Sequence, residues 1–176
     1  DEVSPQSMPS QGSTKNITFH KTLTIPATFS IVYKSPGIPR ANLKLASSKP
    51  RVTSLTNLFF EKAKGTIIGI TGTKGKSTVS SLICHILKKA GKDAKLIGNI
   101  GETGLKLLKD DHSKRYYIYE LSSYQCELLT TSPHVAVITN LYQDHLLHHG
   151  SIKKYHQAKA KITTFQKATD HLLITS

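Results

Sequence analysis

From residue 66 onward, short apolar runs alternate with segments of helical periodicity. Strands are predicted at the β-branched and apolar runs, which are 66–71, 94–97, 115–121, 134–139 and 172–174. Helices are predicted at 76–90, from the turn at 98–101 as far as 109, and at 151–167. Strands that alternate with helices indicate an α/β fold, with a mostly parallel sheet covered by helices on both faces.

The pattern is weaker before residue 66. Residues 1–29 are polar and rich in Ser and Thr, so we expect them to be poorly ordered. A short strand is predicted at 30–33, followed by a turn cluster at 35–39, and a helix near 55–63. We therefore divide the chain into an N-terminal segment, 1–29, a connecting region, 30–65, and an α/β domain, 66–176.

The net charge of the chain limits the classes of ligand that it could bind but does not select one class. The chain carries 24 Lys and Arg against 11 Asp and Glu, a formal net charge of +13. Such a balance suits nucleic acid, an anionic membrane surface or a polyphosphate ligand. The lysines are spread along the chain and do not gather with aromatic residues into a stripe. Charge alone therefore does not select nucleic acid over a small polyphosphate ligand. The motifs described next lead us to expect no nucleic-acid partner.

Membrane insertion and secretion find no support in the sequence. No apolar run approaches the roughly 18–20 residues that span a bilayer, and residues 1–13 lack the features of a secretory signal. The two cysteines, Cys84 and Cys126, lie in apolar-periodic segments, as buried thiols do in a reducing compartment. We expect a cytoplasmic location.

The segment 67–78 carries the clearest chemical signal. A β-branched strand meets glycines, then Lys76 and two hydroxyl residues, then a helix. Glycines let backbone N–H groups approach an anion, and the helix start adds its positive dipole end. Lys76 would reach the β- and γ-phosphates, and a following hydroxyl would bind Mg²⁺. The predicted nucleotide-binding residues are Gly72, Thr73, Lys74, Gly75, Lys76, Ser77 and Thr78.

The spacing of this loop departs from the standard Walker motif. Ile70 stands where the first glycine of that motif is expected, so the loop is a compressed form. An ordinary strand–turn–helix junction therefore stays open as an alternative. The strand before the loop and the helix after it favour nucleotide binding.

Further polar residues follow the other predicted strands. Asn99, Glu120 and the loop at 140–149 all come directly after strands, where parallel sheets bind their ligands. Glu120 offers the oxygen ligands that Mg²⁺ prefers. His145 suits a metal ligand, a base or a structural loop residue, and the residues alone do not distinguish these.

Five motifs in order resemble the central, ATP-binding domain of the Mur ligases, a P-loop NTPase-like fold. They are 71–78, 98–101, 120–125, 140–145 and 155–159. In addition, 35–39 and 57–59 resemble the junction between the UDP-binding and ATP-binding domains in one branch of that family. This branch adds D-glutamate to UDP-N-acetylmuramoyl-L-alanine. The resemblance covers about residues 30–176, and it makes 30–65 the end of a UDP-binding domain with its linker.

The resemblance implies an ATP-dependent amide ligase of peptidoglycan precursor synthesis. The γ-phosphoryl group of ATP would pass to the carboxylate of the nucleotide sugar, and the amine of the incoming amino acid would attack the acyl phosphate. Two Mg²⁺ ions would neutralise the reacting anions. The partners are then a nucleotide-sugar substrate and an amino acid.

The resemblance also implies individual roles for residues of the site. Lys76, His145 and Lys159 would be catalytic. Ser77, Glu120, His145 and Lys159 would hold the metal ions, with Lys159 converted to a carbamate. Ser35 would face the UDP part of the substrate, and Asn99 with Ser122 or Ser123 would face the muramoyl-alanine part.

The chain departs from the family pattern in detail and in extent. Lys74 stands where most relatives carry Asn, Leu147 replaces an acidic residue, and Thr56 with Asn57 replaces an acidic pair. Relatives also begin with a whole UDP-binding domain and continue beyond residue 176. We therefore expect a ligase fragment that does not turn over alone, with the missing domains absent or supplied by a separate chain.

Two alternatives stay open. One is another Mur ligase or a folylpolyglutamate-type synthetase, although the turn at 35–39 favours the D-glutamate-adding branch. The other is a non-catalytic nucleotide-binding or nucleic-acid-binding module that uses its positive charge.

Overall fold

The computed structural model describes residues 24–25, 27–38, 43–45 and 50–175. The prediction of poor order for 1–29 falls mostly outside these residues. The predicted strand at 30–33 is present as β2 (Ile31–Tyr33), and the predicted helix near 55–63 is present as α1 (Leu55–Lys62).

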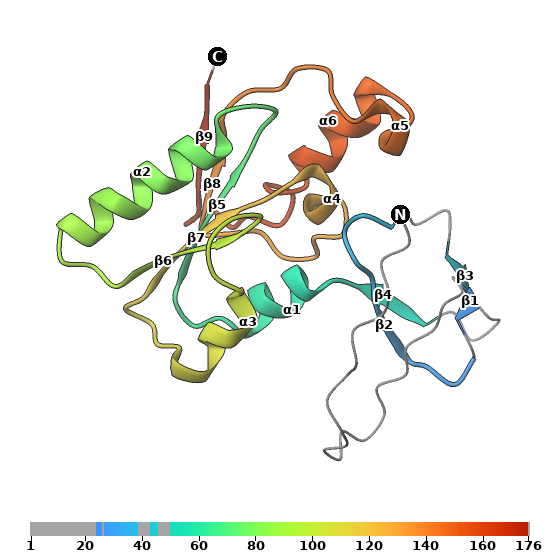
Figure 1. Cartoon of the computed structure of the whole chain (residues 1–176), viewed down its shortest axis with the longest axis horizontal. Coiled ribbons are helices and arrows are strands. Elements are labelled where there is room, and N and C mark those ends of the chain that lie inside the picture. The colour runs from blue at the N-terminus through green and yellow to red at the C-terminus, as the bar shows by residue number, and fades with distance from the viewer. Residues whose placement is uncertain (1–23, 26, 39–42, 46–49, 176) are drawn as a thin grey trace, which may run out of the picture.

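Five parallel strands form the central sheet, in the order β6-β7-β5-β8-β9 (Figure 1). They are β5 (Thr66–Thr71), β6 (Ala94–Gly98), β7 (Tyr116–Glu120), β8 (Val135–Ile138) and β9 (His171–Ile174). The predicted α/β fold is therefore confirmed. Because β5 is central, the loop that follows it lies at the middle of the carboxyl edge of the sheet.

One face of the sheet is covered by α2 (Lys76–Lys89), which packs on β5, β6 and β7. Ile70 and Ile118 from the strands meet Cys84 from the helix in a small buried cluster. The helix ends where predicted, since Gly91 has φ = 71° and takes the left-handed conformation that ends many helices.

The opposite face carries the larger core. Side chains alternate between the faces of a strand, so Tyr117 and Tyr119 of β7 point away from α2. They meet Phe59 of α1, whose ring stands at 90° to that of Tyr117 with the centroids 4.9 Å apart. The other helices are α3 (Gly104–Leu107), α4 (Ser123–Cys126), α5 (Leu146–His149) and α6 (Ile152–Ala160), and a 3₁₀ turn spans Leu108–Asp110.

The connecting region contains more strand than predicted. β2 pairs in parallel with β4 (Arg51–Thr53), and β1 (Thr24–Ile25) pairs in parallel with β3 (Lys44–Leu45). Ser54 then caps α1 by accepting a hydrogen bond from the Asn57 N–H at 3.2 Å. The Asn57 side chain is fully buried, donates to the Leu128 carbonyl and accepts from the Thr130 N–H. This amide ties α1 to the segment after α4, which explains why an uncharged residue stands here.

The prediction of one helix over 151–167 is wrong in length, because α6 ends at Ala160. The Thr163 hydroxyl donates to the Ala160 carbonyl at 2.9 Å, and the next N–H groups bond three residues back instead of four. A threonine side chain that competes for a helical carbonyl in this way favours a turn over continued helix. Ile162 is still fully buried in the core below the turn.

Within the described ranges, no helix combines the length and apolarity that crossing a bilayer requires.

Candidate functional site

The predicted phosphate-binding loop connects β5 to α2 at the carboxyl edge of the sheet. Gly75 directly precedes the helix with φ = 78°, a conformation that glycine adopts without strain. Gly72 has φ = 147°, and a Cβ there would collide with the hydroxyl of Thr139. Both glycines are therefore required by the backbone itself.

The loop is held in shape by the segment that follows β8. The Asn140 side-chain oxygen accepts hydrogen bonds from the N–H groups of Thr73 (3.1 Å) and Lys74 (2.8 Å). Its amide nitrogen donates to the Lys74 carbonyl at 3.0 Å, and the Thr139 hydroxyl donates to the same carbonyl at 2.7 Å. Asn140 thus fixes both sides of the Lys74 residue.

A second support comes from α6. The Thr73 hydroxyl lies 3.0 Å from the Tyr155 hydroxyl and accepts from the Tyr142 N–H at 2.9 Å. Tyr155 is fully buried, and this burial raises the pKa of its hydroxyl. The sequence motifs contained Asn140 and Tyr155, but no pattern in the sequence indicated that either holds the loop.

Two lysines converge on the carbonyl groups of the loop. Lys76 Nζ donates to the carbonyls of Gly72 (3.0 Å) and Thr73 (3.1 Å). Lys159 Nζ donates to the Gly72 carbonyl at 2.7 Å and lies 4.9 Å from the centre of the Tyr155 ring. Lys159 is 1% exposed, and burial, followed by the nearby charge of Lys76, lowers its pKa to about 8.

Glu120 ends β7 and is paired in register with Ile70, near the end of β5 and just before the loop. Its side chain is 1% exposed, and Oε1 accepts from the Asn99 side chain at 3.3 Å. Oε2 is buried and has no hydrogen-bond partner among the described residues. An unpartnered buried carboxylate oxygen is costly, and a cation would satisfy it.

This donor set fits magnesium bound together with phosphate. The described residues contain no group of three or more His, Cys, Asp and Glu side chains able to hold a metal. Mg²⁺ typically takes only one or two carboxylates and completes its shell with phosphate oxygens and water. The exposed hydroxyls of Ser77 and Thr78, in the first turn of α2, are available to such an ion.

His145 lies on the loop between β8 and α5. Its φ of 49° is the left-handed conformation, unusual for a residue other than glycine. Nδ1 lies 3.1 Å from the Tyr124 hydroxyl and Nε2 lies 3.4 Å from Asp144 Oδ2. The ring centroid lies 6.1 Å from that of Tyr155. His145 and Lys159 therefore both lie near the ring of Tyr155.

The two serines after Glu120 already have hydrogen-bond partners. Ser122 caps α4, with its hydroxyl accepting from the Gln125 N–H and its own N–H donating to the Gln125 side chain. Ser123 is 1% exposed, with its hydroxyl 3.0 Å from His149 Nε2. The spacing Ser-x-x-Gln is a capping-box signature, so this short helix could have been found from the sequence.

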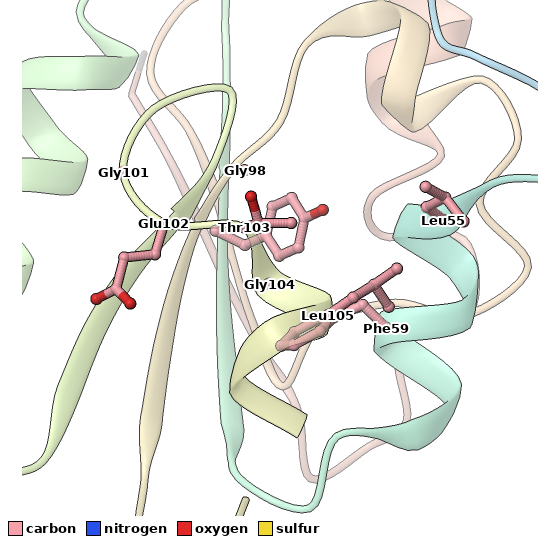
Figure 2. Close-up of a pocket in the computed structure, with 9 residues that line it drawn as sticks. Leu55, Phe59, Gly98, Gly101, Glu102, Thr103, Gly104 and Leu105 are labelled. Carbon is pink, nitrogen blue, oxygen red and sulfur yellow. The ribbon is translucent and has the colours of Figure 1, made fainter. Parts of the chain in front are cut away.

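Two adjacent pockets lie on the β6–β7 side of the loop. Ser35 lines one of about 350 Å³, together with Lys34 and Gln125. Gly98 and Thr103 line the other, of about 170 Å³ (Figure 2). Leu55 and Tyr119 line both pockets, so the two are neighbours. Figure 2 shows that the Glu102 carboxylate, on the rim, points away from the other labelled side chains.

Comparison with known proteins agrees with this geometry. The family model "Mur ligase middle domain" matches residues 70–176. The chain belongs to the Mur ligase family. In fold, it is similar to the UDP-N-acetylmuramate:L-alanyl-gamma-D-glutamyl-meso-diaminopimelate ligase from Neisseria meningitides. That likeness has a TM-score of 0.58 at 14% identity and covers 84% of this chain and 52% of that one.

Curated Mur ligases match this chain over most of its length. The UDP-N-acetylmuramoylalanine–D-glutamate ligase of Lactiplantibacillus plantarum is 36% identical over 88% of this chain and 35% of its own. The ligase of the same name from Rickettsia bellii is 43% identical over 73% of this chain and 29% of its own. A UDP-N-acetylmuramoyl-L-alanine–L-glutamate ligase of Salinispora tropica is 41% identical over 77% of this chain and 30% of its own length. The chain thus spans about a third of the length of these relatives.

The lowered pKa of Lys159 predicts a window in which stability rises with pH. Above about pH 8 the folded chain loses the Lys159 proton, whereas the unfolded chain keeps it up to its ordinary pKa of 10.5. The unfolded state then binds more protons, so the free energy of unfolding increases from pH 8 toward pH 10.5. The free energy of unfolding is measured with urea for wild type and Lys159→Met between pH 7 and 10. The wild-type value minus the variant value should increase with pH.

The exposed Lys88→Met serves as the control, since its difference from wild type should stay flat. A flat difference for Lys159→Met as well would contradict the lowered pKa.

Proposed function

We propose that this chain is the nucleotide-binding part of an ATP-dependent ligase of peptidoglycan precursor synthesis, which adds D-glutamate to UDP-N-acetylmuramoyl-L-alanine. The observation that carries the proposal is the buried, unpartnered oxygen of Glu120 beside a glycine loop that two lysines approach. A magnesium–triphosphate complex supplies what each of these groups lacks. The cation satisfies the carboxylate, and the anion meets the ammonium group of Lys76.

In the proposed complex the loop binds the phosphates through its own backbone and Lys76. The N–H groups at the start of α2 point at the anion, and Lys76 leaves the loop carbonyls to contact the β- and γ-phosphates. Ser77 and Glu120 would hold a magnesium ion, which lowers the repulsion between two reacting anions. Because Asn140 and Tyr155 fix the loop, little ordering is left to be done when the nucleotide binds.

The reaction then needs two successive displacements, the first at the γ-phosphorus and the second at the acyl carbon. A carboxylate oxygen of the muramoyl-alanine attacks the γ-phosphorus, and the bond from phosphorus to ADP breaks. The amine nitrogen of glutamate attacks the acyl carbon, the bond to phosphate breaks, and the amine gives up a proton. In both steps Lys76 would offset the charge of the transferred phosphoryl group.

Lys159 is proposed to act as a carbamate. A lysine amine reacts with CO₂ only when it is unprotonated, and a pKa of about 8 leaves about a tenth of the amine unprotonated at pH 7, far more than the ordinary pKa of 10.5 would. The carbamate is an anion, so it would hold a second magnesium ion together with His145. The nearness of both residues to the ring of Tyr155 supports this pairing.

The nucleotide sugar is proposed to lie in the two adjacent pockets on the β6–β7 side. Ser35 lines the larger pocket, as expected for the UDP end. Asn99 follows Gly98 of the smaller pocket and bonds to Glu120, which supports a place for the muramoyl-alanine near the magnesium. Ser122 and Ser123 have weaker support, because their hydroxyls are engaged in α4 and with His149. We also propose a cytoplasmic location, which the two buried free cysteines support.

The acceptor amino acid has a second candidate. Relatives named for D-glutamate and for L-glutamate match this chain at similar identity, 43% and 41%. What these names share is the UDP-N-acetylmuramoyl-L-alanine substrate. We therefore assign the nucleotide sugar first, and D-glutamate over L-glutamate because more of the relatives carry that name.

Replacing Lys76 tests the phosphate site. Lys76→Ala removes a charged hydrogen-bond donor, so ATP with Mg²⁺ should bind at least about tenfold more weakly by calorimetry. Lys88→Ala, at the other end of α2, should leave the affinity unchanged. If Lys76→Ala binds ATP as wild type does, the loop is not the phosphate site.

Substrate choice can be tested in a fusion protein, in which this chain is joined to the segments of the Rickettsia bellii relative that it lacks. In a parallel experiment, the same segments are added to this chain as a separate polypeptide. Phosphate release from ATP should require UDP-N-acetylmuramoyl-L-alanine and should be faster with D-glutamate than with L-glutamate. Lys76→Ala in the same polypeptide should abolish it. Release that depends on a folate instead would contradict the proposed substrate.

A further inference from the structure

Lys34 is a lysine whose charge is used inside the protein. The residue follows β2 directly and is 3% exposed. Its ammonium group donates to the carbonyls of Ser35 (3.2 Å), Pro36 (3.4 Å) and Ile38 (2.5 Å). Burying an ammonium group is costly, and lysine is almost never fully buried unless polar partners satisfy its charge. Most tight turns form without a buried charge, so Lys34 does more here than help the chain reverse.

The three carbonyls belong to one turn, which Lys34 holds from two directions. The Ile38 N–H donates to the Ser35 carbonyl at 3.2 Å, and this hydrogen bond closes a four-residue turn with Pro36 and Gly37 at its centre. The backbone N–H of Lys34 donates to the carbonyl of Thr53, the last residue of β4, at 2.8 Å. The side chain thus fixes the shape of the turn, and the main chain fixes its place relative to β4.

The turn forms one wall of the pocket of about 350 Å³. Lys34, Ser35 and Pro36 line this pocket together with Ser54 and Thr56, from the start of α1. Carbonyl oxygens and phosphate oxygens are both hydrogen-bond acceptors, so free carbonyls in this wall would oppose a diphosphate. Three carbonyls of the turn are bonded to an ammonium group instead. The wall is therefore shaped to tolerate an anionic ligand.

We propose that Lys34 is a positioning residue for the nucleotide sugar, because it holds the turn at 35–38 in the conformation that accepts the UDP end. The inference rests on the proposed function, since it takes the UDP end to lie in this pocket. Lys34 acts through the turn and not on the reacting atoms. Its loss should therefore weaken the binding of the nucleotide sugar and leave the chemical steps intact.

The first measurement separates substrate binding from chemistry in the fusion protein described above. Lys34→Met keeps a long side chain and removes the charge. The KM for UDP-N-acetylmuramoyl-L-alanine should rise about tenfold, the effect expected when hydrogen bonds to a charged group are lost. The kcat and the KM for ATP should stay at their wild-type values.

Lys62→Met is the matched control, because Lys62 is an exposed lysine at the end of α1 and its replacement removes the same charge. It should leave every kinetic constant unchanged. A similar rise in KM for both variants would assign the effect to net charge and would overturn the role of Lys34.

The second measurement follows the turn itself in the 176-residue chain. The N–H of Ile38 should exchange with solvent at least about tenfold faster in Lys34→Met than in wild type, as measured by NMR, because the turn opens more often. Lys62→Met should exchange as wild type does. Unchanged exchange in Lys34→Met would mean that the turn holds without the ammonium group, against the proposal.

The kinetic outcomes also separate this inference from the proposed function. If the wild-type fusion protein requires the nucleotide sugar, but Lys34→Met has a wild-type KM for it, the inference fails and the proposed function stands. The same holds if Lys34→Met lowers kcat and weakens ATP binding as well, since that result indicates general disruption. If phosphate release by the wild-type fusion protein does not depend on the nucleotide sugar, the proposed function fails and this inference fails with it.

Discussion

The proposed site depends on how the backbone of the loop between β5 and α2 is held. Asn140 hydrogen-bonds to both sides of Lys74, the Thr73 hydroxyl meets Tyr155, and Lys159 holds the Gly72 carbonyl. These contacts come from β8 and α6, which lie far along the chain from the loop. The sheet brings them together because β8 pairs with β5 directly. Without this support, two glycines would leave the loop many conformations, and binding would have to select one of them.

Charged side chains near this loop favour the binding of an anion together with a cation. Lys76 and Lys159 both donate to the Gly72 carbonyl, and the Lys159 ammonium is buried. On the neighbouring strand, Glu120 carries a buried carboxylate oxygen without a partner among the described residues. Positive groups and a negative group thus lie near one edge without neutralising each other. An anion bound together with a cation resolves both imbalances, which is why a magnesium nucleotide fits better than either ion alone.

The sequence predicted what short segments determine by themselves. The β-branched run at 66–71 and the periodicity of 76–90 fixed β5 and α2, and glycines marked the loop between them. It did not predict contacts between distant segments, such as Asn140 with Lys74, because an amide side chain has no preferred partner until the strands are in register. Periodicity also overstated α6, since Ile162 keeps the helical spacing although Thr163 turns the backbone. Likewise the sequence did not predict that the Ser123 hydroxyl is hydrogen-bonded to His149, because His149 lies on α5, a helix that was not expected.

The most direct test of the account is where a divalent cation binds when nucleotide is present. Crystals of the chain grown with ADP and Mn²⁺ as a stand-in for Mg²⁺ would locate the ion by its anomalous scattering. The account predicts a peak that contacts Glu120 Oε2, the Ser77 hydroxyl and a β-phosphate oxygen lying on the glycine loop. A nucleotide bound with its cation away from Glu120, or with its phosphates off the loop, would contradict it.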